Sequence, residues 1–172
     1  ELYIKNNTGK WQKPYSFVQA VAQKTEGHPL YMNYLCRYIS DKFNEKTTET
    51  ELNDWIKSLP SIGGDIRSYY NAIWQRFQPD GCTIEILALL SQVRGSIDEQ
   101  QLIAMMHDHD SYKFASSITE FKHLLKEQDT TKKYEIYHSS FSLYITNRLG
   151  LTIVKHTNDQ IAQYCEANVD ST

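Results

Sequence analysis

Apolar residues recur at helical spacing through the first half of the chain. The pattern predicts four helices: one from Tyr15 to Gly27, one from Pro29 through Ile39, a short one around Trp55 that ends before Pro60, and one from Ile66 to Phe77. Glycine often ends a helix and proline suits the first turn of one, so Gly27 and Pro29 mark a corner. Residues 44–50 are polar and form a link, and Asp65 can cap the fourth helix.

The second half carries three more helical stripes and then a pattern typical of a β-hairpin. The stripes cover residues 84–93, 96–106 and 114–125, and the second opens at Ser96. Residues 129–132 are polar and predict a hairpin tip, and residues 134–137 alternate as a return strand does. Three helices followed by a two-stranded wing is the order of a winged helix, a variant of the helix-turn-helix. Two further helices are expected at about 140–149 and about 153–167.

The chain is therefore expected to be mainly α and to contain two small units. The turn "QPDG" at residues 78–81 marks the boundary between them. We expect a helical bundle over 1–79, a winged-helix domain with a small β-hairpin wing over 80–150, and a C-terminal helical extension over 151–172.

Composition narrows the class of protein. The chain has 172 residues, of which 40% are hydrophobic and 12% aromatic, and this favours a packed globule over disorder. A net charge of −3 provides no broad positive field, which argues against nucleic acid as a partner.

The cysteines indicate the compartment. The chain has three dispersed cysteines, Cys36, Cys82 and Cys165, and no CxxC pair. This disfavours a disulfide scaffold or a thiolate zinc site and favours the cytoplasm. No apolar run in these residues is long enough for a membrane span, and we expect no signal peptide. Because the sequence starts at Glu1, we expect a piece of a longer protein.

Two short stretches carry the candidate chemistry. The first is "TEGHPLYMNYL" at residues 25–35, and the second is "YEIYHSSFSLYI" at residues 134–145. In the second, His138 stands at the joint between a strand and a helix, where Ser139 or Ser140 can cap the helix. Both stretches also have a purely structural interpretation. Gly27 to Pro29 would then end one helix and begin the next, and His138 would be a partly buried histidine at a turn.

Taken together, the two stretches resemble parts of the STAND-class NTPases, the signalling ATPases that include the NACHT and NB-ARC families. The first resembles the GxP motif of their helical lid. The second resembles the end of their winged-helix domain, where a histidine follows the wing. Ser139 stands where many members, particularly plant NB-ARC proteins, have an aspartate, and this is closer to the "HxSF" form of other branches.

The resemblance implies a nucleotide site. Gly27 and Pro29 match the GxP glycine and proline, and Pro29 would pack on the adenine ring. His138 would reach the phosphates of bound ADP and help to hold the closed, inactive state. The bound cofactor would be ADP or ATP, with Mg in the parent protein. The partners would be an upstream nucleotide-binding domain of the same chain and, on activation, further copies of the protein.

The catalytic parts of that family are absent from this sequence. No Walker A motif GxxxxGK[ST] and no acidic Walker B strand occurs in the 172 residues. The chain by itself is therefore expected not to be an enzyme, and the expected role is control of a closed-to-oligomeric switch.

Two other readings compete with the nucleotide site. The residues "MHDHD" at 106–110 contain metal-ligand types, although a polar loop in which Asp110 caps the next helix is the simpler interpretation. A non-catalytic winged helix that binds DNA or a protein is the alternative function. For DNA, the third helix and wing offer few basic groups: Lys113, Lys122, His123, Lys126, Lys132 and Lys133.

Overall fold

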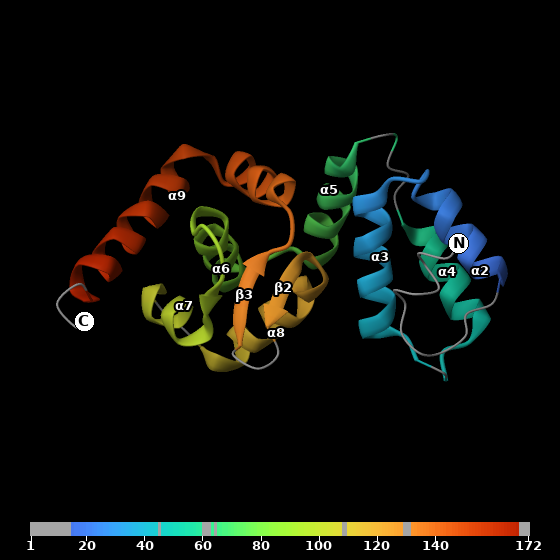
Figure 1. The fold of residues 1–172 in the computed structure, drawn as a ribbon, viewed down its shortest axis with the longest axis horizontal. Coiled ribbons are helices and arrows are strands. Elements are labelled where there is room, and N and C mark those ends of the chain that lie inside the picture. Colours follow the sequence, from blue (N-terminus) through green and yellow to red (C-terminus); the bar gives the residue numbers. More distant parts are fainter. Residues whose placement is uncertain are drawn as a thin grey trace. The chain divides into compact units, whose positions relative to one another are not determined.

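The computed structural model describes residues 15–44, 46–59, 63, 65–107, 110–128 and 132–168. Within them the chain is mainly α with one small antiparallel sheet, which confirms the predicted fold class. The chain divides into two compact units, one ending at Arg76 and the other starting at Phe77 (Figure 1). No helix in the described part of the chain combines the length and the apolarity that crossing a membrane requires.

The first unit is a bundle of helices. Its described helices are α2 (Tyr15–Lys24), α3 (Pro29–Lys42), α4 (Glu49–Ser58) and α5 (Ile66–Phe77). Thr48 and Glu51 form a capping box at the start of α4, so the predicted polar link is shorter than residues 44–50. Asp65 accepts the backbone N–H of Arg67 at 2.9 Å, which confirms the predicted cap of α5.

Four tyrosines from α3 and α5 form the centre of the first unit: Tyr31, Tyr34, Tyr69 and Tyr70. The ring centroids of Tyr31 and Tyr69 lie 4.5 Å apart, and the hydroxyls of Tyr34 and Tyr70 lie 3.3 Å apart. Such ring pairs stabilise a core beyond their buried area. Burial raises the pKa of Tyr31, Tyr34 and Tyr69, because the phenolate form is poorly solvated there.

The second unit follows the order of a winged helix. Its elements are α6 (Gly81–Gln92), β1 (Ile97–Asp98), α7 (Glu99–Met105), α8 (Ser111–Phe121), the 3-10 helix η1 (Lys122–Leu124), β2 (Leu125–Gln128), β3 (Lys133–Ile136) and α9 (Ser139–Asn168). The sheet order is β1-β3-β2 and both pairings are antiparallel. Ile97 pairs with Tyr134, and Leu125 pairs with Ile136, so the buried side chains of all three strands line one face.

The sequence analysis was wrong at two places in this unit. Ile97 and Asp98 were expected at the start of a helix, but they form β1, and Asp98 then caps α7. Leu124 and Leu125 were expected in the third helix, but α8 ends at Phe121 and Leu125 opens β2. In both places pairing with β3 overrides the helical period. At the predicted hairpin tip, residues 129–131 lie outside the described residues.

The two predicted closing helices are present as the two segments of α9, which meet at a kink at Gly150. At Gly150, α9 takes a non-helical conformation with φ 77 and ψ 168, which glycine adopts at little steric cost. The helix bends there and passes over α6 (Figure 1). Phe141, Tyr144 and Ile145 are buried before the bend, and Thr157 and Gln160 after it. Both segments of α9 therefore belong to the second unit.

The buried tyrosines predict a loss of stability of the first unit at alkaline pH. A group whose pKa is raised on folding contributes stability below its unfolded pKa, about 10 for tyrosine, and that stability is lost as pH rises through the folded pKa. We expect the urea midpoint to fall above about pH 10. Tyr34→Phe should make this fall less steep. Near-ultraviolet absorbance would contradict the account if every tyrosine ionised near pH 10 while the fold stayed intact.

Candidate functional site

The first predicted motif forms a tight corner between α2 and α3. Glu26 has φ 51 and Gly27 has φ 72, so two successive residues are left-handed after α2 ends. A Cβ at Gly27 would meet nothing within 4 Å. Glycine is therefore favoured here by its backbone conformation and not by crowding. Pro29 follows at the first position of α3 and is exposed.

His28, the middle residue of this corner, caps α3. The backbone N–H of Tyr31 donates to His28 Nδ1 at 3.3 Å. The sequence pattern gave His28 no role, because it is the variable middle position of the GxP motif. Its position directly before a proline at N1 was the signal that could have identified it.

His138 makes the same kind of contact in the second unit. It is exposed and stands between β3 and α9. Its Nδ1 accepts the backbone N–H of Ser140 at 3.2 Å, and it lies 2.9 Å from Ser140 Oγ. The cap was expected from Ser139 or Ser140, but it comes from the histidine ring. Nε2 of His138 has no hydrogen-bond partner among the described residues.

Backbone hydrogen bonds fix the joint on both sides of His138. The N–H of Tyr137 donates to the carbonyl of Leu124 at 2.9 Å, and the N–H of Phe141 donates to the carbonyl of His138 at 2.9 Å. The side chain of Phe141 is buried beneath the joint. The imidazole therefore projects from a rigid support. The structure brings Gly27 and Pro29 together at one corner of the first unit, whereas His138 belongs to the second unit.

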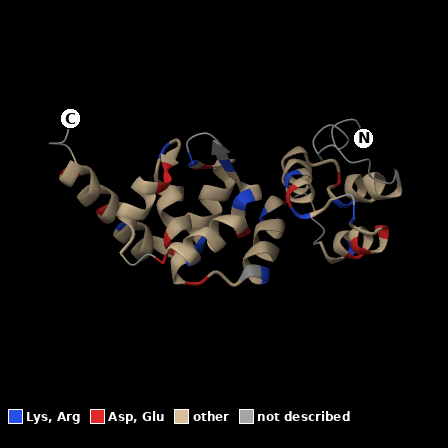
Figure 2. Ribbon diagram, turned by 90° about the horizontal axis from the view of Figure 1, so that it is seen from below, with Lys and Arg blue, Asp and Glu red and all other residues tan. Residues whose placement is uncertain are grey.

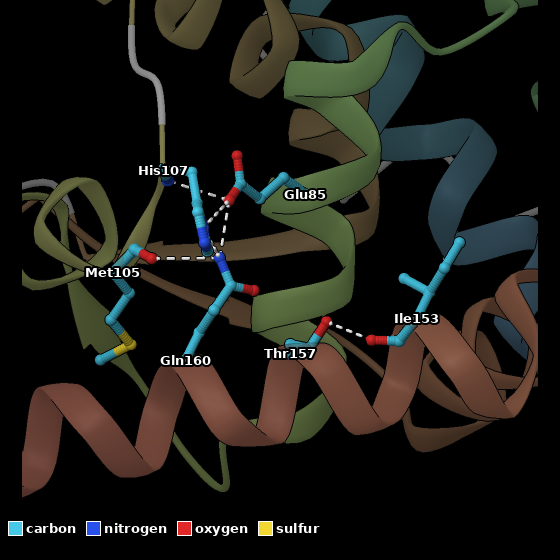
Figure 3. A network of polar contacts seen from close by, with 6 residues as sticks. All are labelled: Glu85, Met105, His107, Ile153, Thr157 and Gln160. Carbon is cyan, nitrogen blue, oxygen red and sulfur yellow. Dashed lines mark hydrogen bonds and ion pairs between the residues drawn. The ribbon is translucent and has the colours of Figure 1, made fainter.

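From the "MHDHD" stretch, His107 takes part in a polar network (Figure 3). Glu85 on α6 accepts the backbone N–H of His107 at 3.0 Å and the Nε2 amide of Gln160 at 2.8 Å. Gln160 also donates to the carbonyl of Met105 at 3.3 Å and contacts His107 Nδ1. These contacts tie α6, the end of α7 and the second segment of α9 together.

The neighbouring residues fit this structural role. Asp110 accepts the backbone N–H groups of Tyr112 and Lys113, at 2.8 and 3.3 Å, which confirms its predicted capping of α8. Asp108 and His109 lie outside the described residues. Among the residues that are described, no group of three histidine, cysteine or acidic side chains is arranged to hold a metal ion.

A hollow of about 460 Å³ adjoins this network. Cys82 lines it together with His107, Asp110 and Lys113. Burial raises the pKa of the Cys82 thiol, so the thiol stays protonated near neutral pH. A protonated thiol is a poor nucleophile, and this disfavours cysteine-based catalysis at Cys82.

The wing carries little uncompensated positive charge. Lys126 pairs with Glu135 at 3.0 Å, and Lys132 pairs with Glu99 at 3.4 Å. Along the part of the chain that the structure describes, basic and acidic positions are interspersed in both units (Figure 2). On α8, Tyr112 is 83% exposed and Lys113 is exposed beside it. Carboxylates next to the wing lysines weaken their attraction for phosphate.

No known protein family, curated protein or solved structure matches this chain.

Two substitutions separate the capping role of His138 from any role of its imidazole. His138→Ala removes the acceptor at the start of α9, so unfolding of the second unit should cost about 1 kcal/mol less. His138→Asn keeps a good capping acceptor and should stay within about 0.5 kcal/mol of the wild type. Urea unfolding measured by circular dichroism tests both. An alanine variant as stable as the wild type would contradict the cap.

Proposed function

We propose that this chain is the helical lid and winged-helix segment of a STAND-type signalling ATPase in the cytoplasm. It senses whether ADP or ATP is bound and controls a closed-to-oligomeric switch. It is not itself an enzyme, because ATP and Mg are held by an upstream nucleotide-binding domain of the same protein. The observation that carries the proposal is the place of His138. It is exposed directly after the third strand of a winged helix, and this domain follows a helical unit with the Gly27–Pro29 corner.

The lid side of the proposed site has the properties that packing against an adenine base requires. Pro29 is exposed, and its ring is a rigid apolar plate. The left-handed backbone at Gly27 turns the chain sharply before Pro29, and the cap from His28 holds the first turn of α3. A fixed apolar surface loses little entropy when an adenine ring packs on it.

The winged-helix side has the properties that a phosphate requires. Phosphate oxygens accept hydrogen bonds, and the outer nitrogen of His138 is open to solvent on a fixed joint. In the proposed closed state, His138 binds the phosphates of ADP. Exchange for ATP removes this contact, the winged helix moves away and the protein oligomerises. This is a two-state equilibrium biased by differential ligand contacts.

The competing function is a winged helix that binds DNA or another protein. For DNA, the ion pairs of Lys126 and Lys132 and the few basic residues on α8 are unfavourable. A fluorescence-anisotropy titration with duplex DNA at low salt distinguishes the two functions. Salt-sensitive binding that is lost in a Lys132→Gln/Lys133→Gln variant would favour the DNA function.

The nucleotide proposal predicts weaker ADP retention when the imidazole is removed. In the intact protein, His138→Asn keeps the helix cap and loses one hydrogen bond to a charged phosphate, worth about 1.5–3 kcal/mol. We expect ADP affinity to fall by about tenfold to a hundredfold. Nucleotide released from the denatured protein is quantified by chromatography, and light scattering reports the oligomeric state, which should shift toward oligomers.

His156→Asn is the matched control, because His156 is another exposed histidine of the second unit. It should leave both ADP content and oligomeric state unchanged. Pro29→Ala should also reduce ADP retention, because it removes the packing on the adenine ring and leaves the phosphate contact in place. Unchanged ADP content and oligomeric state in both His138→Asn and Pro29→Ala would contradict the proposed function.

A further inference from the structure

The contacts of His138 determine which of its ring nitrogens carries the proton. Its Nδ1 faces two groups of Ser140, the backbone N–H at 3.2 Å and Oγ at 2.9 Å. A backbone N–H can only donate a hydrogen bond, so Nδ1 must be the acceptor and must be unprotonated. The Ser140 hydroxyl can rotate, so its proton can also point at Nδ1.

The opposite tautomer fits these contacts poorly. If Nδ1 carried the proton, it could donate to Ser140 Oγ, but its N–H would then face the N–H of the Ser140 backbone. The backbone donor would lose its acceptor at the first turn of α9, where backbone N–H groups have no partner within the helix. The neutral ring therefore carries its proton on Nε2.

We propose that Ser140 is a positioning residue that holds His138 in the neutral Nε2–H tautomer. Ser140 acts through its backbone N–H, which donates to Nδ1, so the exposed nitrogen of the neutral ring is a donor. The functional meaning rests on the function proposed above, since a phosphate oxygen requires a donor and is repelled by a ring nitrogen lone pair. With this tautomer the uncharged ring offers that donor.

His28 provides a comparison within the same chain. Its Nδ1 also accepts a backbone N–H, from Tyr31 at 3.3 Å. The residue two positions after His28 is Leu30, whereas the residue two positions after His138 is Ser140. His28 thus has the backbone donor without a hydroxyl from the corresponding position. His28 should therefore adopt the same Nε2–H tautomer, because its Nδ1 also accepts a backbone N–H.

The test is nitrogen NMR of the 172-residue chain with ¹⁵N-labelled histidine, at a pH where the rings are neutral. His138→Asn assigns the His138 signals by their disappearance. In the wild type we expect a fully protonated Nε2 and a fully unprotonated Nδ1. In Ser140→Ala the two His138 shifts should stay as in the wild type, because the backbone donor to Nδ1 remains. In Ser140→Pro, which removes that donor, the two shifts should move toward each other, because the other tautomer becomes populated.

The outcomes separate tautomer control from a general loss of structure. The His28 signals and the urea midpoint should be unchanged in Ser140→Ala, since the backbone donor remains. A wild-type His138 with protonated Nδ1, or with the averaged shifts of free histidine, would overturn the proposal. Unchanged His138 shifts in Ser140→Pro would overturn the role of the backbone donor. None of these measurements uses nucleotide, so they can succeed even if ADP proves not to bind the intact protein.

Discussion

The second unit depends on the burial of one helix, α6. Residues 86–90 of α6 are all buried, and α8, α9 and β3 all pack against the helix. Each large aliphatic side chain buried in this way contributes about 1.5–3 kcal/mol. Both β3 and α9 pack against α6, and Phe141 and Ile145 in the first turns of α9 are buried. This packing fixes the backbone of the joint between β3 and α9. His138 stands at that joint, so the packing of an apolar helix determines where a polar ring projects.

The two units use the same device at their proposed ligand contacts. In each, a histidine directly before a helix accepts a backbone N–H of the first turn through Nδ1. This bond satisfies a donor that the helix leaves without a partner and also fixes the ring. A capping histidine is therefore both structural and available for chemistry at its other nitrogen. The plain interpretation of His138 as a turn residue and the nucleotide interpretation are thus compatible.

The sequence pattern predicted the fold class, most helices and the wing, because long apolar stripes and capping residues act locally. Asp65 and Asp110 were identified as caps for that reason. It missed β1, because a two-residue strand has no period and exists only through its pairing with β3. It also placed Leu125 in the third helix of this unit, although Leu125 pairs with Ile136 in the sheet. A single apolar residue at the end of a helical pattern fits a helix and a strand equally well. For the proposed site, the motifs singled out Gly27, Pro29 and His138 as candidates. The capping by His28 and the contact between His138 and Ser140 depend on side-chain geometry, which the motifs do not give.

The most direct test of the central claim is the protein sequence that precedes Glu1 in the natural gene product, determined from the transcript and checked by the intact mass of the purified protein. The account predicts a GxxxxGK[ST] phosphate loop that follows a strand and opens a helix, with an acidic-ended strand between that loop and Glu1. A start codon a few residues upstream, with no phosphate loop, would contradict it. The chain would then be a small winged-helix protein in which His138 serves only as a helix cap.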